Sequence, residues 1–262
     1  MRTVIVTGAY GAIGKAIARG MAEQGYQLSL VGRDEAALND CCRDLIRQTG
    51  NKHISWMQAD LSKKQEVKAL AAQWRGPLHV LINNAATTPR TRQETPQGIE
   101  LQFATNVLGY FWMMQYFAPY MQGLDNARIV NVASYWAGDL DMEDLEFKRR
   151  RYDNDTAYRQ SKQANRMLTV AFAKRLKPQG ISVLSAHPGD VRSKLSTNLG
   201  YGGWESPEEG AATPLYCALD PGLNNITGAY FANNRQEACR FSANEAEVEQ
   251  LYALCAGYQE PE

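Results

Sequence analysis

The sequence predicts an α/β fold with one doubly wound parallel sheet of about seven strands and helices on both faces. Short apolar segments of strand length alternate with longer amphipathic segments from the first residues onward. This alternation is typical of a parallel sheet whose two faces are both covered by helices. No repeat, low-complexity tract or Pro/Gly-rich linker divides the 262 residues. We therefore expect a single domain over residues 1–262.

The elements are expected to follow one another in regular order. Strands are predicted at Val4–Val6, Gln27–Val31, His53–Gln58, Leu78–Ile82, Arg128–Val132, Ile181–Ala186 and Gly228–Phe231. Helices are predicted at Gly14–Gln24, Asp34–Gln48, Lys63–Trp74, Gly98–Met121 and Asp155–Leu176, with another from Pro207 and one after the last strand. The charged stretch Asp139–Asp155 is interpreted as a solvated surface insertion.

Composition excludes several classes of function. Lys and Arg number 28, as do Asp and Glu, so the net charge of zero gives no electrostatic reason to expect nucleic acid or an anionic membrane as a partner. No apolar run approaches the roughly 18–20 residues of a membrane span, and a strand so near the first residue leaves no room for a signal peptide. Five cysteines without a Cys-x-x-Cys pair predict free thiols in a cytoplasmic protein. The three histidines lie far apart, so we expect no metal site.

A glycine-containing turn joins the first predicted strand to the first predicted helix. Such a turn points helix N-terminal amides at a pyrophosphate, and glycines let the backbone approach it. The spacing differs from G-x-G-x-x-G, yet it favours a dinucleotide. The residues expected to contact it are Gly8, Tyr10, Gly11, Ala12, Ile13 and Gly14.

The end of the second predicted strand bears on the choice between NADP(H) and NAD(H). An acidic residue there would bind the ribose 2′-hydroxyl of NAD, whereas an arginine accommodates a 2′-phosphate. Gly32 stands where the acid would be, and Arg33 follows it. We therefore favour NADP(H), and we interpret Asp34 as a helix N-cap.

Tyr158 and Lys162 are spaced i, i+4 on one predicted helix and so share a face. A free tyrosine has a pKa near 10. A nearby ammonium group is expected to lower that pKa, which would make Tyr158 a proton donor to a carbonyl oxygen. Lys162 is also expected to hold the nicotinamide ribose.

Five segments resemble motifs of the classical short-chain dehydrogenase/reductase family, in particular its retinol dehydrogenase and carbonyl reductase-like group. They are Thr7–Gly14, Asn83–Ala86, Asn131–Ser134, Ala157–Asn165 and His187–Val191. The resemblance covers nearly the whole chain and implies a Rossmann-type domain. It also implies that Ser134 binds the substrate carbonyl and that Asn106 perturbs its helix and holds a water beside Lys162.

The same resemblance implies further contacts to the cofactor. The implied residues are Asp60, Leu61, Asn84, Ala85, Ala86, Val132, Pro188, Gly189, Val191 and Ser193, besides Tyr158 and Lys162. His187 is expected to be structural, because the family carries its proton chemistry on tyrosine.

Two branches of the family fit the first turn. Ala12 replaces the middle glycine of the classical T-G-x-x-x-G-x-G pattern, and the glycines fit the T-G-x-x-G-x-x-G of the epimerase-like branch equally well. The C-terminal half favours the classical type. We therefore expect an NADP(H)-dependent enzyme acting on CH–OH groups, interconverting a carbonyl and an alcohol on an apolar small molecule. The alternatives are a catalytically silent NADP-binding regulator and an epimerase or dehydratase.

Specificity is expected to come from a short glycine-rich loop at about residues 191–206. Loops of this kind can act as mobile gates, and its shortness argues against a retinoid. The side chains predicted to line the substrate pocket are Tyr135, Trp136, Leu140, Tyr201 and Trp204. Both a homodimer and a monomer remain open, since the insertion at about residues 139–155 could cover the surface used for dimerisation in the family.

Overall fold

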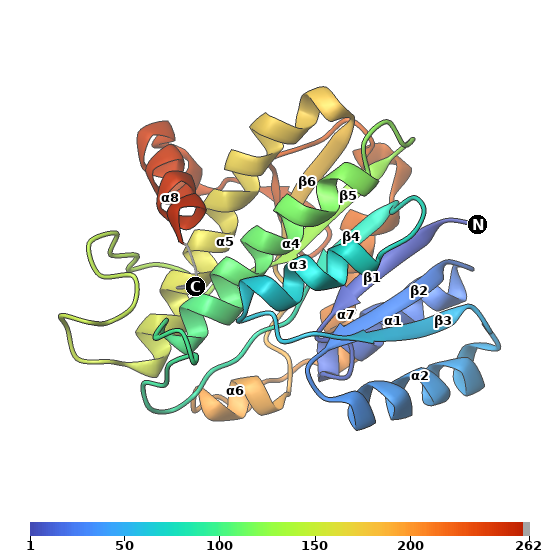
Figure 1. Cartoon of the computed structure of the whole chain (residues 1–262), viewed down its shortest axis with the longest axis horizontal. Helices are drawn as coiled ribbons and strands as arrows, with labels where there is room; N and C mark the ends of the chain where they lie inside the picture. The colour runs from blue at the N-terminus through green and yellow to red at the C-terminus, as the bar shows by residue number, and fades with distance from the viewer. Residues whose placement is uncertain (259–262) are drawn as a thin grey trace.

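Eight strands form one sheet in the computed structural model, which describes residues 1–258 (Figure 1). The strand order is β3-β2-β1-β4-β5-β6-β7-β8, and every pair is parallel except β7 with β8. The strands are β1 Thr3–Thr7, β2 Gln27–Gly32, β3 Ile54–Gln58, β4 Val80–Asn83, β5 Ala127–Val132, β6 Ile181–Ala186, β7 Tyr230–Ala232 and β8 Arg235–Glu237. The predicted fold class is confirmed.

The eighth strand was not predicted from the sequence. β8 is an exposed polar edge strand that pairs antiparallel with β7. The two strands are joined by Asn233 and Asn234, whose φ angles are 50° and 57°. Two successive positive φ values are typical of a type I′ hairpin turn, in which asparagine is favoured.

Helices cover both faces of the sheet. One face carries α1 Ala12–Glu23, α2 Glu35–Thr49 and α7 Pro207–Leu219, and the other carries α3 Lys64–Gln73, α4 Gly109–Phe117 and α5 Asn154–Leu176 (Figure 1). α8 Glu245–Gly257 packs outside α5. Each face has its own apolar core, as expected for a sheet with buried strands. No helix of residues 1–258 has the length and apolar character needed to cross a bilayer.

The helix expected from about Gly98 to Met121 is shorter and less regular. A π-helical turn at Phe103–Leu108 precedes α4, and a 3₁₀ turn containing Pro119 ends it. Asn106 lies inside the π-helical turn, where its side-chain oxygen accepts a hydrogen bond from Thr87 N at 2.8 Å and its nitrogen donates to Thr87 O at 3.0 Å. π-helical turns of this kind are frequent at functional sites.

The insertion at residues 139–155 exposes most of its charged side chains, as expected, but it is also anchored to the body of the domain. The side chains of Leu145 and Phe147 are buried. The buried carboxylate of Asp144 accepts backbone N–H groups of three successive residues, 148–150, at 2.7–3.1 Å. These hydrogen bonds fix the loop, although residues 139–153 contain no helix or strand.

The cysteines match the expectation of free thiols. All five are unpaired, and Cys41, Cys42, Cys217 and Cys255 are buried. Burial raises the pKa of the Cys41 thiol to about 11 and that of Cys217 to about 12. These thiols act as small apolar side chains of the core.

Candidate active site

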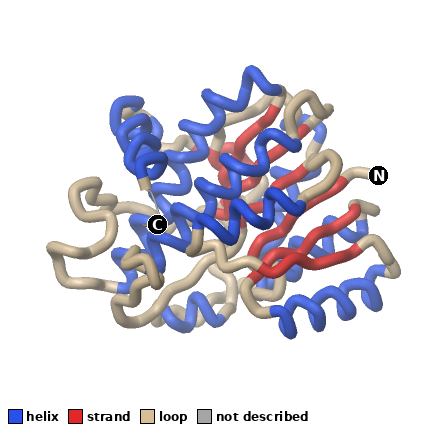
Figure 2. The backbone as a smooth tube through the Cα atoms, in the orientation of Figure 1, coloured by secondary structure: helices blue, strands red, loops and turns tan. Residues whose placement is uncertain are grey.

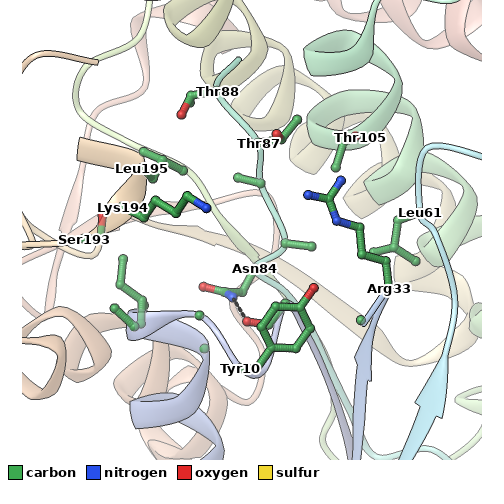
Figure 3. A pocket seen from close by; sticks show the side chains of 18 of the residues that line it. Tyr10, Arg33, Leu61, Asn84, Thr87, Thr88, Thr105, Ser193, Lys194 and Leu195 are labelled. Carbon is green, nitrogen blue, oxygen red and sulfur yellow. Dashed lines mark hydrogen bonds between the residues drawn. The ribbon is translucent and has the colours of Figure 1, made fainter. Parts of the chain in front are cut away.

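A cleft of about 340 Å³ opens at the carboxyl ends of β1, β2, β3 and β4. It lies where the strand order reverses between β1 and β4, the place at which open α/β sheets bind ligands. Loops gather at this end of the sheet (Figure 2). Of the predicted cofactor contacts, those that line the cleft are Gly8, Tyr10, Gly11, Ala12, Ile13, Gly14, Arg33, Asp60, Leu61, Asn84, Ala85, Ala86 and Ser193 (Figure 3).

The glycine turn is shaped by contacts within the chain itself. Gly8 has a φ of 62°, and a Cβ atom there would lie 2.8 Å from Ala85 Cα. A Cβ on Gly14 would clash with the carbonyl of Gly8. Asn84 donates from Nδ2 to the carbonyl oxygens of Thr7 at 2.9 Å and Gly8 at 3.3 Å. These contacts hold the first turn of α1 toward the cleft, where its free amides can receive a pyrophosphate.

The far end of the cleft is formed by Tyr10, Gly32 and Arg33. A Cβ atom on Gly32 would lie 2.5 Å from Cε1 of Tyr10, so the tyrosine ring occupies the space of any side chain at position 32. The exposed side chain of Arg33 extends along the same end of the cleft, beside Leu61 (Figure 3). Asp34 caps α2 as expected, accepting from Ala37 N at 3.0 Å.

The four predicted catalytic residues come from three segments of the chain. Tyr158 and Lys162 lie on α5, Ser134 follows β5, and Asn106 lies in the π-helical turn. Lys162 is buried and donates from Nζ to Val132 O at 2.9 Å. Its Nζ lies 5.6 Å from the centroid of the Tyr158 ring. Two of the predicted cofactor contacts, Val132 and Lys162, are therefore buried behind the residues that line the cleft.

The protein's own groups raise the pKa of Tyr158 instead of lowering it. Burial raises this pKa to about 12, the carboxylates of Asp190 and Asp155 add to the rise, and a hydrogen bond with Ser134 opposes it. Burial also lowers the pKa of Lys162 to about 7. The expectation that Lys162 depresses the pKa of Tyr158 is thus wrong for the protein alone, because the low-dielectric site disfavours both charges.

A second, smaller cavity continues from the cleft and reaches Tyr158 and Ser134. The two cavities share Ile13, Ser193 and Leu195. Pro188, Gly189 and Val191 also line the second cavity. The Ser193 hydroxyl accepts from Ser196 N at 3.1 Å and so caps α6 Lys194–Asn198, a short helix that sequence reasoning missed.

Three of the five predicted substrate contacts are brought together and two are not. Tyr135, Trp136 and Tyr201 line the second cavity. Leu140 packs against the apolar core on the α5 side of the sheet, and Trp204 is 86% exposed to solvent. The assignments of Leu140 and Trp204 to the substrate pocket were therefore wrong. The course of their loops directs both side chains away from the cavity, and residue spacing in the sequence does not reveal that course.

His187 lies behind this cavity. Its ring packs edge-on to Tyr135 with centroids 4.6 Å apart. Burial and the nearby Arg166 charge lower its pKa to about 4. A histidine that is neutral at physiological pH and packed in this way agrees with its interpretation as structural.

Comparison with known proteins shows the family of the chain. A family model described as short chain dehydrogenase matches residues 2–202. Human "Retinol dehydrogenase 13" is 32% identical, with 94% of this chain and 81% of that protein covered. A "Probable oxidoreductase" of Streptomyces antibioticus is also 32% identical, covering 90% of this chain and 86% of its own. A crystal structure of a putative uncharacterized protein from Mycobacterium paratuberculosis matches with a TM-score of 0.81 and 26% identity over 100% of this chain and 96% of that one.

The fold and site define a dinucleotide-dependent oxidoreductase of the doubly wound α/β class. The chain belongs to the short chain dehydrogenase family, within its retinol dehydrogenase-like group. Membership implies a nicotinamide cofactor and interconversion of carbonyl and alcohol groups in general terms.

Proposed function

We propose that the protein is an NADP(H)-dependent oxidoreductase that interconverts a ketone or aldehyde with an alcohol on a small apolar molecule. One observation carries the proposal. Ser134 and Tyr158 border a small cavity that opens directly into the dinucleotide cleft. A carbonyl group placed there lies next to both hydroxyl groups and beside the nicotinamide end of the cleft.

Each residue has a distinct part in this chemistry. When bound, the reduced cofactor supplies a hydride. Ser134 orients the carbonyl oxygen by a hydrogen bond, and Tyr158 donates the proton that the oxygen needs. With its pKa raised to about 12, Tyr158 is protonated at neutral pH, which is the form required for reduction. Lys162 retains two N–H groups beyond its bond to Val132 O with which to hold the nicotinamide ribose.

The preference for NADP(H) over NAD(H) rests on Arg33 and Gly32. The exposed guanidinium suits a 2′-phosphate. Gly32 has no side chain to bind the 2′-hydroxyl of NAD, and an acidic residue at this position would require the Tyr10 ring to move.

We also propose a monomeric, cytoplasmic protein. α8 packs along α5, where Tyr252 contacts Phe111 and Phe172 with ring centroids 5.2 and 5.3 Å apart. These contacts cover a face of α4 and α5 that would otherwise be open to a second copy. The free, mostly buried cysteines support a reducing compartment.

The test is oxidation of NADPH, followed by its absorbance, with a panel of ketones, aldehydes and quinones. Tyr158→Phe is expected to lower kcat/KM by at least about 100-fold, the usual contribution of a positioned proton donor, while NADPH binding measured by calorimetry persists. Tyr216→Phe on α7 is the matched control and should behave as wild type. Undiminished turnover by Y158F would remove Tyr158 from the mechanism, and no turnover of any carbonyl would favour a regulatory protein.

A further inference from the structure

The small cavity beside Tyr158 is walled by aromatic rings. Trp136 lies between Tyr135 and Tyr201, with ring centroids 6.1 and 5.8 Å away and edge-to-face geometry. The cavity volume is about 110 Å³. An apolar cavity of roughly 150 Å³ holds a benzene molecule, so this smaller space limits the bound group to one ring at most, with the rest of the molecule extending toward the open side.

One carboxylate fixes the outer wall of the cavity. Asp155, in the first turn of α5, accepts on Oδ1 both the indole N–H of Trp136 at 2.8 Å and the hydroxyl of Tyr201 at 3.2 Å. Trp136 belongs to the loop after β5 and Tyr201 to the loop after α6. The two rings are 38% and 42% exposed, so hydrogen bonds to Asp155 hold them where burial does not.

The outer face of Trp136 is covered as well. The Arg159 guanidinium lies 5.4 Å from the Trp136 ring centroid. Arg159 is itself paired with Asp139 at 2.6 Å. This pairing offsets the charge of Arg159, so Arg159 adds little positive potential inside the cavity.

The electrostatic character of the cavity is negative. Asp190 is the one charged side chain among its lining residues, all of which belong to the described part of the chain. Asp155 stands at the rim, and both carboxylates act on the Tyr158 hydroxyl by raising its pKa. Two buried cations lie behind the lining. Lys162 has its Nζ 5.6 Å from the centroid of the Tyr158 ring and donates to Val132 O, and Arg166 packs on Tyr230 with its Cζ atom 3.6 Å from the ring centroid.

We propose that this cavity binds an uncharged or cationic planar carbonyl compound of about one ring and rejects anionic ones, with Asp155 as the positioning residue of its aromatic wall. The inference rests on the proposed carbonyl chemistry and adds the charge and size of the substrate. Two carboxylates near the reacting oxygen repel a third negative charge, and the exposed rings attract a planar or cationic group.

The test compares two substrates of nearly equal shape, methyl 4-formylbenzoate and 4-formylbenzoate. Wild-type enzyme is expected to favour the neutral ester by at least about tenfold in kcat/KM, as one partly screened unit-charge repulsion predicts. Asp190→Asn and Asp155→Asn are each expected to narrow this ratio several-fold. Asp125→Asn, an exposed residue before β5 at the opposite end of the sheet, is the control and should leave the ratio unchanged.

A second pair of variants separates the charge of Asp155 from its positioning role. An asparagine at position 155 keeps an oxygen that can accept from Trp136 and Tyr201, whereas alanine keeps none. Asp155→Ala is therefore expected to raise KM for the ester at least several-fold above that of D155N. Equal KM values in the two variants would remove the positioning role.

Failure of this inference is distinguishable from failure of the proposed function. A wild-type ratio near one, or a ratio unmoved by both D190N and D155N, overturns the selection by charge while carbonyl reduction stands. If neither aldehyde is reduced, their dissociation constants for the NADP⁺-loaded protein, from quenching of tryptophan fluorescence, decide the inference. If wild-type protein binds 4-formylbenzoate more weakly than the methyl ester, the selection by charge is supported. Equal binding of the two compounds refutes it.

Discussion

Replacing Arg33 with alanine is expected to remove the ability to distinguish a 2′-phosphate from a 2′-hydroxyl on the adenosine ribose. Arg33 lies at the same end of the cleft as Tyr10, across from Ser193 and Leu195 (Figure 3). Its guanidinium forms no ion pair with any residue in 1–258, so it is available to an anionic ligand. Gly32 offers no side chain that could take over its role.

The size of the effect follows from the exposure of Arg33. A hydrogen bond to a charged group contributes about 1.5–3 kcal/mol, but exposed ion pairs are weakened by solvent. Because the Arg33 side chain is exposed, we take about 1–2 kcal/mol, equivalent to a loss of roughly 5–30-fold in affinity.

The assay is isothermal titration calorimetry with adenosine 2′,5′-bisphosphate and adenosine 5′-monophosphate at one ionic strength. Arg33→Ala should weaken binding of the bisphosphate by that factor and leave the monophosphate unchanged. Arg235→Ala, an exposed arginine on β8, is the control. Equal losses for both ligands, or no preference in wild type, would refute the assignment of Arg33 to the 2′-phosphate.

Three further predictions concern the cofactor, the buried lysine and the insertion. Gly32→Asp alone should weaken the binding of both NADPH and NADH, because its Cβ atom would lie 2.5 Å from Tyr10 Cε1. The double variant G32D with Tyr10→Ala should bind NADH at least as tightly as NADPH, measured by calorimetry. The folded-state pKa of Lys162, about 7, is below its ordinary 10.5, so the unfolded chain binds more protons between these values and stability rises with pH across that window. Lys162→Met should remove that rise, stabilising the protein by roughly 4 kcal/mol more at pH 7 than at pH 10 in urea unfolding; an unchanged pH slope contradicts this. Asp144→Ala should cost about 2–3 kcal/mol by stranding buried amides of residues 148–150, while the exposed Glu143→Ala costs under about 0.5; equal losses would show that Asp144 does not anchor the insertion.

The sheet could be predicted because its central strands are buried on both faces. All residues of β1, β4, β5 and β6 are buried, so these strands are largely continuous apolar runs bounded by polar turns. β8 lacks that signal: it is three exposed polar residues, specified by the Asn233–Asn234 turn. That asparagine pair was the signal available in the sequence.

The positions of the proposed catalytic residues were predictable for a similar reason. Tyr158 and Lys162 are placed by helical spacing on α5, and Ser134 directly follows a buried strand. The pocket wall was less predictable, because Leu140 and Trp204 belong to loops whose course is set by contacts far apart in the sequence. The Asp155 bond to Tyr201, across 46 residues, is one such contact.

Both ends of the ligand cleft therefore depend on contacts that lie outside the apolar cores. At the cofactor end Tyr10 covers Gly32, and at the substrate end Asp155 holds two exposed rings. Surface substitutions usually change the free energy of unfolding by under about 0.5 kcal/mol, whereas truncating a core ring such as the fully buried Trp112 would cost about 3–5 kcal/mol. The residues that set recognition are thus those whose replacement the fold tolerates best. We therefore expect that one or two substitutions at either end can change the proposed cofactor and substrate preferences while the sheet and the Ser134–Tyr158 pair stay in place.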